Sequence, residues 1–147
     1  MKVTTLLKGI VSLVSALFLI LQLVLIGSAA FIRPAYEENW TLIGGPPPGF
    51  STQFNITNQG IIPVQNLVIY ARVYNSSGDY LEGYSLPATI QAFTTKVITI
   101  NMYEILPGGT ITDGNYTLIA RVTGAFLGAL ISFTIVINYT STFNFPP

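Results

Sequence analysis

The sequence of 147 residues contains no cysteine and no histidine. Without these residues the chain cannot form a disulfide, a Ser-His-Asp or Cys-His catalytic arrangement, or a zinc site built from the preferred zinc ligands. The six acidic residues are scattered along the chain, and no glycine-rich phosphate loop follows a strand and opens a helix. We therefore expect a protein that is not an enzyme and that has no metal and no cofactor.

Charge is also scarce, since charged residues make up 8 % of the chain against about 25 % in an average protein. Six basic and six acidic side chains give a formal net charge of zero. A surface of this kind does not attract nucleic acid, so nucleic acid is not an expected partner. Beyond the hydrophobic N-terminal part, the length leaves roughly 100 residues, which is enough for one domain.

One long hydrophobic run, from Ile10 to Ile32, carries no charged residue. As an α-helix with a rise of about 1.5 Å per residue, this run is roughly 34 Å long and can cross a hydrocarbon core of about 30 Å. We predict a transmembrane-type helix over 10–33. Lys2 and Lys8 in the short basic head, 1–9, indicate a cytoplasmic N-terminus and an extracellular remainder.

Three processing fates are open for this N-terminal part. It is retained as an uncleaved anchor, it is a secretory signal cut near Gly27–Ala30, or it is cut between Gly9 and Ile10 as a class III-type signal. The expected partners are membrane lipid, further copies of the chain through the hydrophobic helix, and other envelope proteins.

The segment after the helix is rich in proline and glycine. Pro34 is expected to end the helix, and Tyr36 and Trp40 fall where aromatic side chains favour the interface between membrane and water. Gly-Gly followed by three prolines bends and then stiffens the chain. We therefore predict a stalk over 34–49.

From Phe50 onward the hydrophobic pattern has a period of two, which is typical of half-buried strands. The predicted strands are 50–57, 67–74, 80–85, 89–93, 96–102, 116–123 and 129–139. Six or seven short strands at this spacing predict an Ig-like antiparallel β-sandwich over 50–140, followed by a C-terminal tail over 141–147. Tyr116, two residues before Leu118, matches the tyrosine corner of Ig domains, and a strand-starting tyrosine explains it equally well.

Glycosylation acceptor triplets of the form Asn-X-Ser/Thr are frequent in the sequence. They begin at Asn39, Asn55, Asn75, Asn115 and Asn138. Chance alone gives about 1.5 such triplets for this content of asparagine, serine and threonine. The excess predicts an extracellular, glycosylated surface, whereas asparagine and threonine are also simply common in turns and strands.

A first family resemblance rests on Lys8-Gly9-Ile10-Val11, the long helix and the sandwich rich in acceptor triplets. This layout resembles an archaeal type IV pilin or a related archaellum-type surface protein. The resemblance implies cleavage between Gly9 and Ile10 and a filament whose core is a bundle of helices. Val14 stands where that family often has a glutamate.

A second resemblance rests on 58–64, 67–69 and 74–78. These segments are similar to archaeal membrane-anchored domains of the water-stress, late-embryogenesis-abundant type, which implies an anchored accessory or adhesion module.

Together these features predict a non-enzymatic archaeal cell-surface structural protein. We expect a subunit of a type IV pilus-like filament that serves adhesion or surface attachment. The alternative is an uncleaved single-span envelope, accessory or stator-like interaction module whose β-sandwich faces outward.

Overall fold

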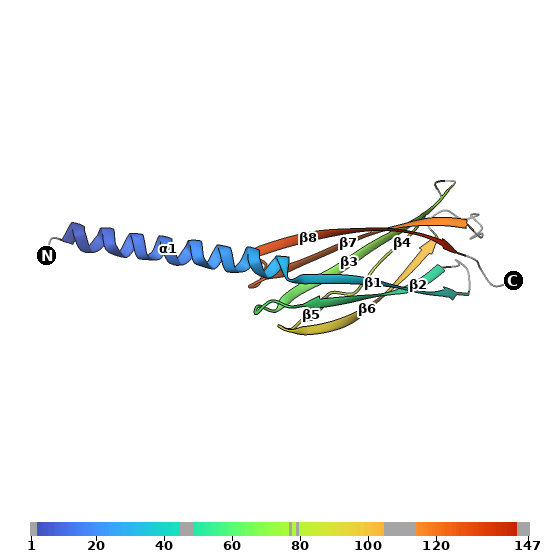
Figure 1. The fold of residues 1–147 in the computed structure, drawn as a ribbon, viewed down its shortest axis with the longest axis horizontal. Helices are drawn as coiled ribbons and strands as arrows, with labels where there is room; N and C mark the ends of the chain where they lie inside the picture. The colour runs from blue at the N-terminus through green and yellow to red at the C-terminus, as the bar shows by residue number, and fades with distance from the viewer. Residues whose placement is uncertain (1–2, 45–48, 77, 79, 105–113, 144–147) are drawn as a thin grey trace.

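The structure is a computed structural model, and it describes residues 3–44, 49–76, 78, 80–104 and 114–143. Within these ranges it contains one helix followed by a β-domain (Figure 1). The elements are α1 (Val3–Ala30), β1 (Ile32–Ile43), β2 (Gly49–Asn58), β3 (Val64–Asn75), β4 (Tyr80–Tyr84), β5 (Ala88–Ile90), β6 (Thr94–Glu104), β7 (Gly114–Phe126) and β8 (Ile131–Phe143).

Helix α1 ends at Ala30, two residues before the end of the predicted hydrophobic run. The backbone N–H of Phe31 donates to the carbonyl of Ser28 at 3.1 Å, and the next residue already pairs with β2. Pro34 lies inside β1 and therefore does not end the helix. At its other end α1 begins at Val3, so that the described part of the predicted basic head is also helical.

The strands form a curled antiparallel sheet in the order β1-β2-β6-β4-β3-β7-β8, with β5 paired to β3 off this path. Every strand pair along the path is antiparallel. The curl brings the two ends of the path together, because the ring centroids of Tyr36 in β1 and Tyr139 in β8 are 4.9 Å apart. The prediction of a mainly β protein with one N-terminal apolar helix is confirmed.

The hydrophobic core lies inside the curl and follows the predicted period of two. Along β2, for example, the side chains of Phe54 and Ile56 are fully buried, while the side chain of Gln53 in the same strand is exposed. Large side chains with almost no exposure include Phe54, Ile56, Leu67, Ile69, Ile100, Met102, Leu118, Val122 and Phe126. These side chains come from strands far apart in the sequence, so burial of the inner face holds the sheet in its curled form.

The first strand corrects the expectation of a stalk over 34–49. Residues 32–43 form β1, which pairs with β2 from Ile32 opposite Asn58 to Ile43 opposite Gly49. Tyr36 and Trp40 pack against the core instead of facing a membrane interface. The physical reason is their spacing of four, which puts both rings on the inner face of an extended strand, although the register shifts between Glu37 and Thr41. The expected proline run at 46–48 lies outside the described residues.

The last strand also differs from the expectation. Ala129 and Leu130 belong to the turn before β8, and β8 continues to Phe143, so the first three residues of the predicted tail are part of the sheet. The remaining tail residues, 144–147, lie outside the described part of the chain.

Replacement of Tyr36 by alanine tests whether β1 belongs to the core. The Tyr36 ring contacts Phe54, Trp40 and Tyr139, with centroid distances of 5.2, 6.1 and 4.9 Å. We expect Tyr36→Ala to lower the free energy of unfolding of the full chain by about 2 kcal/mol, because a large, partly buried ring is lost. Denaturation followed by the fluorescence of the single tryptophan, Trp40, measures this change.

The matched control is Ala35→Ser on the exposed face of the same strand. A surface change of this kind alters stability by less than about 0.5 kcal/mol. If Tyr36→Ala is as mild as the control, β1 does not contribute to the core.

Candidate functional site

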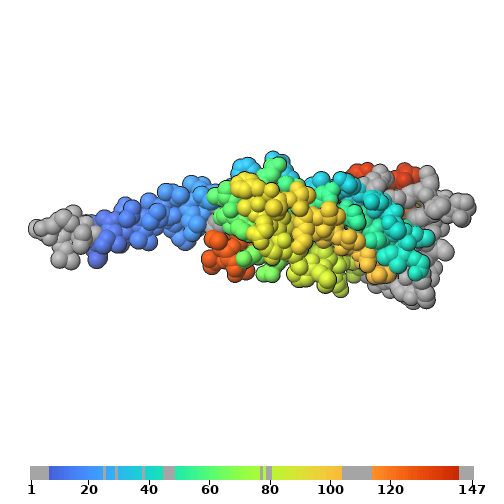
Figure 2. Space-filling view, turned by 90° about the horizontal axis from the view of Figure 1, so that it is seen from below, coloured from blue at the N-terminus to red at the C-terminus, as the bar shows by residue number. Residues whose placement is uncertain are grey.

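Helix α1 stands clear of the β-domain over most of its length (Figure 2). All described side chains from Leu7 to Val24 are exposed, and Leu7–Ser28 meets the length and composition of a membrane-crossing helix, with burial confined to its last turn. Secretory signal sequences meet the same criteria near an N-terminus. The helix is therefore an apolar surface without a partner in the β-domain except at its last turns.

Strand register defines the end of the β-domain from which α1 emerges. Ile32, the first residue of β1, pairs with the last residue of β2, and that residue, Asn58, also pairs with Thr94 at the start of β6. Val64 at the start of β3 pairs with Ile90 in β5. Three connecting loops, 59–63, 91–93 and 127–130, consequently lie at this end, which we call the helix-proximal end (Figure 1).

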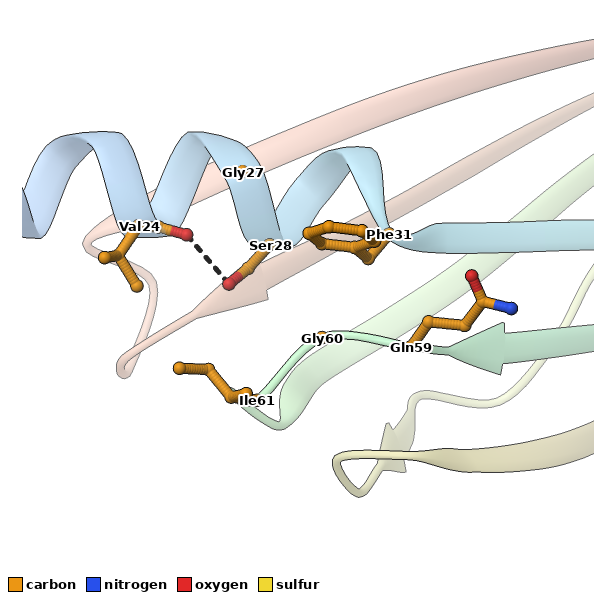
Figure 3. A pocket seen from close by; sticks show the side chains of 7 residues that line it. All are labelled: Val24, Gly27, Ser28, Phe31, Gln59, Gly60 and Ile61. Atoms are coloured by element: carbon orange, nitrogen blue, oxygen red, sulfur yellow. Dashed lines mark hydrogen bonds between the residues drawn. The ribbon is translucent and has the colours of Figure 1, made fainter.

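An open groove of about 350 Å³ lies between the last turns of α1 and the loop 59–63. Its lining residues are Val24, Gly27, Ser28, Phe31, Gln59, Gly60 and Ile61. Figure 3 shows the Val24 and Ile61 side chains on facing walls of this groove. Backbone contact closes one end of it, because the N–H of Gln59 donates to the carbonyl of Phe31 at 3.1 Å. The groove is mostly apolar in its side chains.

The buried amide of Asn58 organises the loops around this groove. Its Nδ2 donates to the carbonyl of Ile62 at 2.9 Å and lies 3.4 and 3.3 Å from the carbonyls of Ile90 and Gln91. Its Oδ1 accepts from the N–H of Gly60 at 3.0 Å. Asn58 is completely buried, so these bonds satisfy an amide that would otherwise be costly to bury. In the sequence Asn58 directly follows the predicted strand 50–57, and no role was assigned to its side chain.

A second polar feature is the cluster of Tyr70, Arg72, Tyr74 and Glu82 on the outer face of β3 and β4. Arg72 Nη2 and Nε donate to Glu82 Oε2 at 2.7 and 3.1 Å, and Arg72 Nη1 donates to the Tyr74 hydroxyl at 3.2 Å. The Tyr70 hydroxyl donates to the same Glu82 oxygen. The guanidinium carbon of Arg72 lies 5.5 and 5.9 Å from the ring centroids of Tyr70 and Tyr74.

These contacts perturb the ionisation of the cluster. Hydrogen bonds from Tyr70 and from Arg72 lower the pKa of Glu82. Partial burial, followed by the bond to Glu82, raises the pKa of Tyr70, and hydrogen bonds to Tyr74 and Glu82 raise the pKa of Arg72. Because one carboxylate oxygen is shared by both donors, the cluster works as a cross-strand clamp between β3 and β4.

The five predicted glycosylation residues all lie on strands. Asn75 pairs with Tyr116 and therefore lies on the strand next to Asn115, while Asn39, Asn55 and Asn138 lie on three other strands. Asn39, Asn115 and Asn138 are exposed, while Asn55 and Asn75 are half-buried. Asn55 Nδ2 donates to Glu37 Oε1 at 2.6 Å, so the atom that would carry a glycan is already engaged. Among the described residues, no group of three or more acidic side chains suits a metal ion.

The predicted processing residues lie in the exposed part of α1. Gly9 has open space around its Cα, and the Ile10 side chain is 52 % exposed. The helix continues through both residues without interruption.

Comparison with solved structures identifies proteins of similar fold. A protein of Arabidopsis thaliana, AT1g01470, solved in solution, has a TM-score of 0.58 at 17 % identity, with 79 % of this chain and 83 % of that chain covered. A putative late embryogenesis abundant protein, At2g46140.1, has a TM-score of 0.56 at 10 % identity, with coverages of 92 % and 88 %. The structural-genomics target SoR45 gives 0.54 at 14 %, with coverages of 76 % and 86 %.

Neither a protein-family model nor a curated protein matches the sequence. At these low identities the structural likeness concerns the fold alone. The expected likeness to a late-embryogenesis-abundant domain is thereby confirmed for the architecture of the chain, since one neighbour is described as such a protein.

The pH dependence of stability tests the clamp. Because the folded-state pKa of Glu82 is below its ordinary value of 4.5, the bonds that its carboxylate accepts from Tyr70 and Arg72 stabilise the fold above that pH. This stabilisation is lost as the pH falls through the folded-state pKa. We expect Glu82→Gln to lower the melting temperature at about pH 7 and to lose this effect in acid. Arg72→Met should likewise make the melting temperature depend less on pH between acid and about pH 7. If the difference in melting temperature between the unchanged chain and Glu82→Gln stays constant across the pH range, the clamp is contradicted.

Proposed function

We propose that the chain is a non-enzymatic, membrane-anchored surface module, in which α1 crosses a membrane and the β-domain lies outside as an Ig-like sandwich for structural or binding interactions. The observation that carries this proposal is the exposure of α1 from Leu7 to Val24, which carries no charged residue from Ile10 onward. Only Phe31 separates this helix from β1, the strand at one end of the sheet. Exposed apolar side chains over such a length are unfavourable in water and favourable in lipid.

A second candidate is a subunit of a type IV pilus-like filament. Lys8-Gly9-Ile10-Val11 supports it, together with the exposure of α1 from Ile10 onward, because a bundle of helices would bury the same apolar surface that lipid would cover. In this arrangement the β-domains would form the outer layer of the filament.

Intact mass of the protein from its native host distinguishes these candidates. Retention of the full N-terminus supports the anchor, and loss of 1–9 supports the filament. Loss of the chain through about Ala30 would identify α1 as a secretory signal and would contradict both candidates.

Placement of an arginine in the middle of α1 tests the membrane role. We expect Leu21→Arg to oppose insertion by about 2.5–3.5 kcal/mol, because a charged side chain is costly near the bilayer centre. Leu21 is 44 % exposed, so the substitution leaves the β-domain untouched. Membrane fractionation measures the effect, and Leu42→Arg on the exposed face of the β-domain is the matched control. Equal recovery of both variants in the membrane would count against the proposal.

Glycopeptide mass spectrometry tests the outward orientation. We expect Asn39, Asn115 and Asn138 to carry glycans in preference to Asn55, because their side chains are exposed and the Asn55 amide is bonded to Glu37. Protein from the native host with all these asparagines unmodified would remove glycosylation as support for an extracellular domain.

A further inference from the structure

The helix-proximal end of the β-domain displays large apolar side chains to solvent. They are contributed by the residue after α1 and by all three loops of this end: Phe31 (49 % exposed), Ile61 (65 %), Phe93 (71 %), Leu127 (41 %) and Leu130 (79 %). Single exposed apolar residues are ordinary, but their convergence from four separate segments on one end is typical of an interaction surface.

The charge pattern of this end restricts what it binds. The loops 59–63, 91–93 and 127–130 contain no charged residue. The nearest charges on the flanking strands are the cations Arg33 in β1 and Lys96 in β6, both exposed. An uncharged apolar surface with cations behind it fits the boundary of a lipid bilayer, where acyl chains lie below anionic phosphates.

Backbone conformation adds a second observation. Phe93, Leu127 and Ala129 have φ values of 58, 51 and 76°, in the left-handed region that turns usually fill with glycine or asparagine. For residues other than glycine and asparagine this backbone conformation costs free energy, and burial of these exposed side chains within the domain does not offset the cost. This combination of local strain and exposed apolar side chains is typical of a site that is stabilised by a binding partner.

The position of the loops relative to α1 identifies the partner. Ile61 shares the groove with Val24, Gly27 and Ser28, so it lies beside the last turns of the apolar helix and not beyond them. From Val24 to Ser28 the helix rises about 6 Å, which is close to the thickness of the headgroup region on one side of a bilayer. If α1 crosses the membrane up to Ser28, Ile61 lies at the depth of the interface.

We propose that the helix-proximal end is a lipid-binding surface, in which the tips of the loops 59–63, 91–93 and 127–130 insert into the membrane interface and seat the β-domain directly on the bilayer. This inference rests on the proposed membrane anchoring of α1. It adds a second membrane contact, made by the β-domain itself. The occupant is the bilayer that contains α1, because the loop 59–63 lies beside the last turns of the helix and the other two loops lie at the same end of the β-domain (Figure 1).

The absence of cysteine makes the surface directly measurable in the full chain. Single-cysteine variants carry one environment-sensitive fluorophore each, at Phe93 and Leu130 in the loops, at Phe18 in α1, and at Leu42 on the opposite end of β1. The full-length protein is reconstituted into phosphatidylcholine–phosphatidylglycerol vesicles with or without brominated acyl chains. Leu42 is the matched control, since it is a 55 % exposed leucine opposite Phe50, far from α1.

We expect brominated lipid to quench the probes at Phe18, Phe93 and Leu130 several-fold more than the probe at Leu42, and aqueous iodide to show the reverse order. Quenching of the Phe18 probe without quenching of the loop probes overturns the lipid-binding surface and leaves the anchor intact. A Phe18 probe without lipid quenching overturns the anchor itself. Loop probes shielded from iodide but indifferent to brominated lipid overturn the proposal in favour of a second copy of the chain.

A charge substitution tests the same surface independently. Leu130→Asp should raise the iodide accessibility of the Phe93 probe in vesicles several-fold, because an acidic residue at the helix-proximal end opposes insertion of that end into the membrane. Leu42→Asp should leave that accessibility unchanged. Both positions are exposed, so an unaltered unfolding transition verifies the fold of each variant. Equal effects of the two substitutions would contradict the proposed surface.

Discussion

The pairing between the start of β1 and the end of β2 is the constraint on which the arrangement of the chain depends. Ile32 pairs with Asn58 immediately after α1 ends, and the carbonyl of Phe31 accepts the N–H of Gln59. Asn58 then uses its buried amide to hold the loop 59–63 and the chain at Ile90 and Gln91. Because these bonds follow one another without a flexible spacer, the direction of the helix is coupled to the position of the loops. A stalk would have uncoupled them.

Most of the sheet could be predicted from the sequence, because apolar residues alternate with polar ones along much of its core strands. In β2 and β7 each second side chain is buried, and this pattern is visible without a structure. The first strand was missed for a physical reason. Pro34 and the proline run after Ile43 suggested a stalk, yet a proline is tolerated on a strand at the end of a sheet, as in β1. The positions of Tyr36 and Trp40 are compatible both with aromatic residues at a membrane interface and with two residues on the same face of a strand.

The candidate site was much less accessible from the sequence. The burial of Ile61 and Phe93 depends on where each strand ends and on the register in which it pairs. In the sequence alone, an apolar residue in a short loop cannot be distinguished from the last residue of a strand. The positive φ values at Phe93 and Leu127 occur without the glycine or asparagine that normally marks them. Asn58 follows a predicted strand, but the role of its side chain depends on the carbonyls of Ile90 and Gln91, which are distant in sequence. The acceptor asparagines were found directly, because a triplet is local.

The few charged residues of the chain are distributed unevenly between the two ends of the β-domain. The described outer face of β3 and β4 carries its ion pair between Arg72 and Glu82 as a clamp within the sheet. The three loops of the helix-proximal end contain no charged residue, and the nearest charged residues on the flanking strands, Arg33 and Lys96, are both cations. An acidic residue at that end would be repelled by anionic headgroups and costly to insert into the interface. Under the proposed anchoring, the distribution of the few charges, more than their number, keeps one end of the domain compatible with lipid while the other faces water.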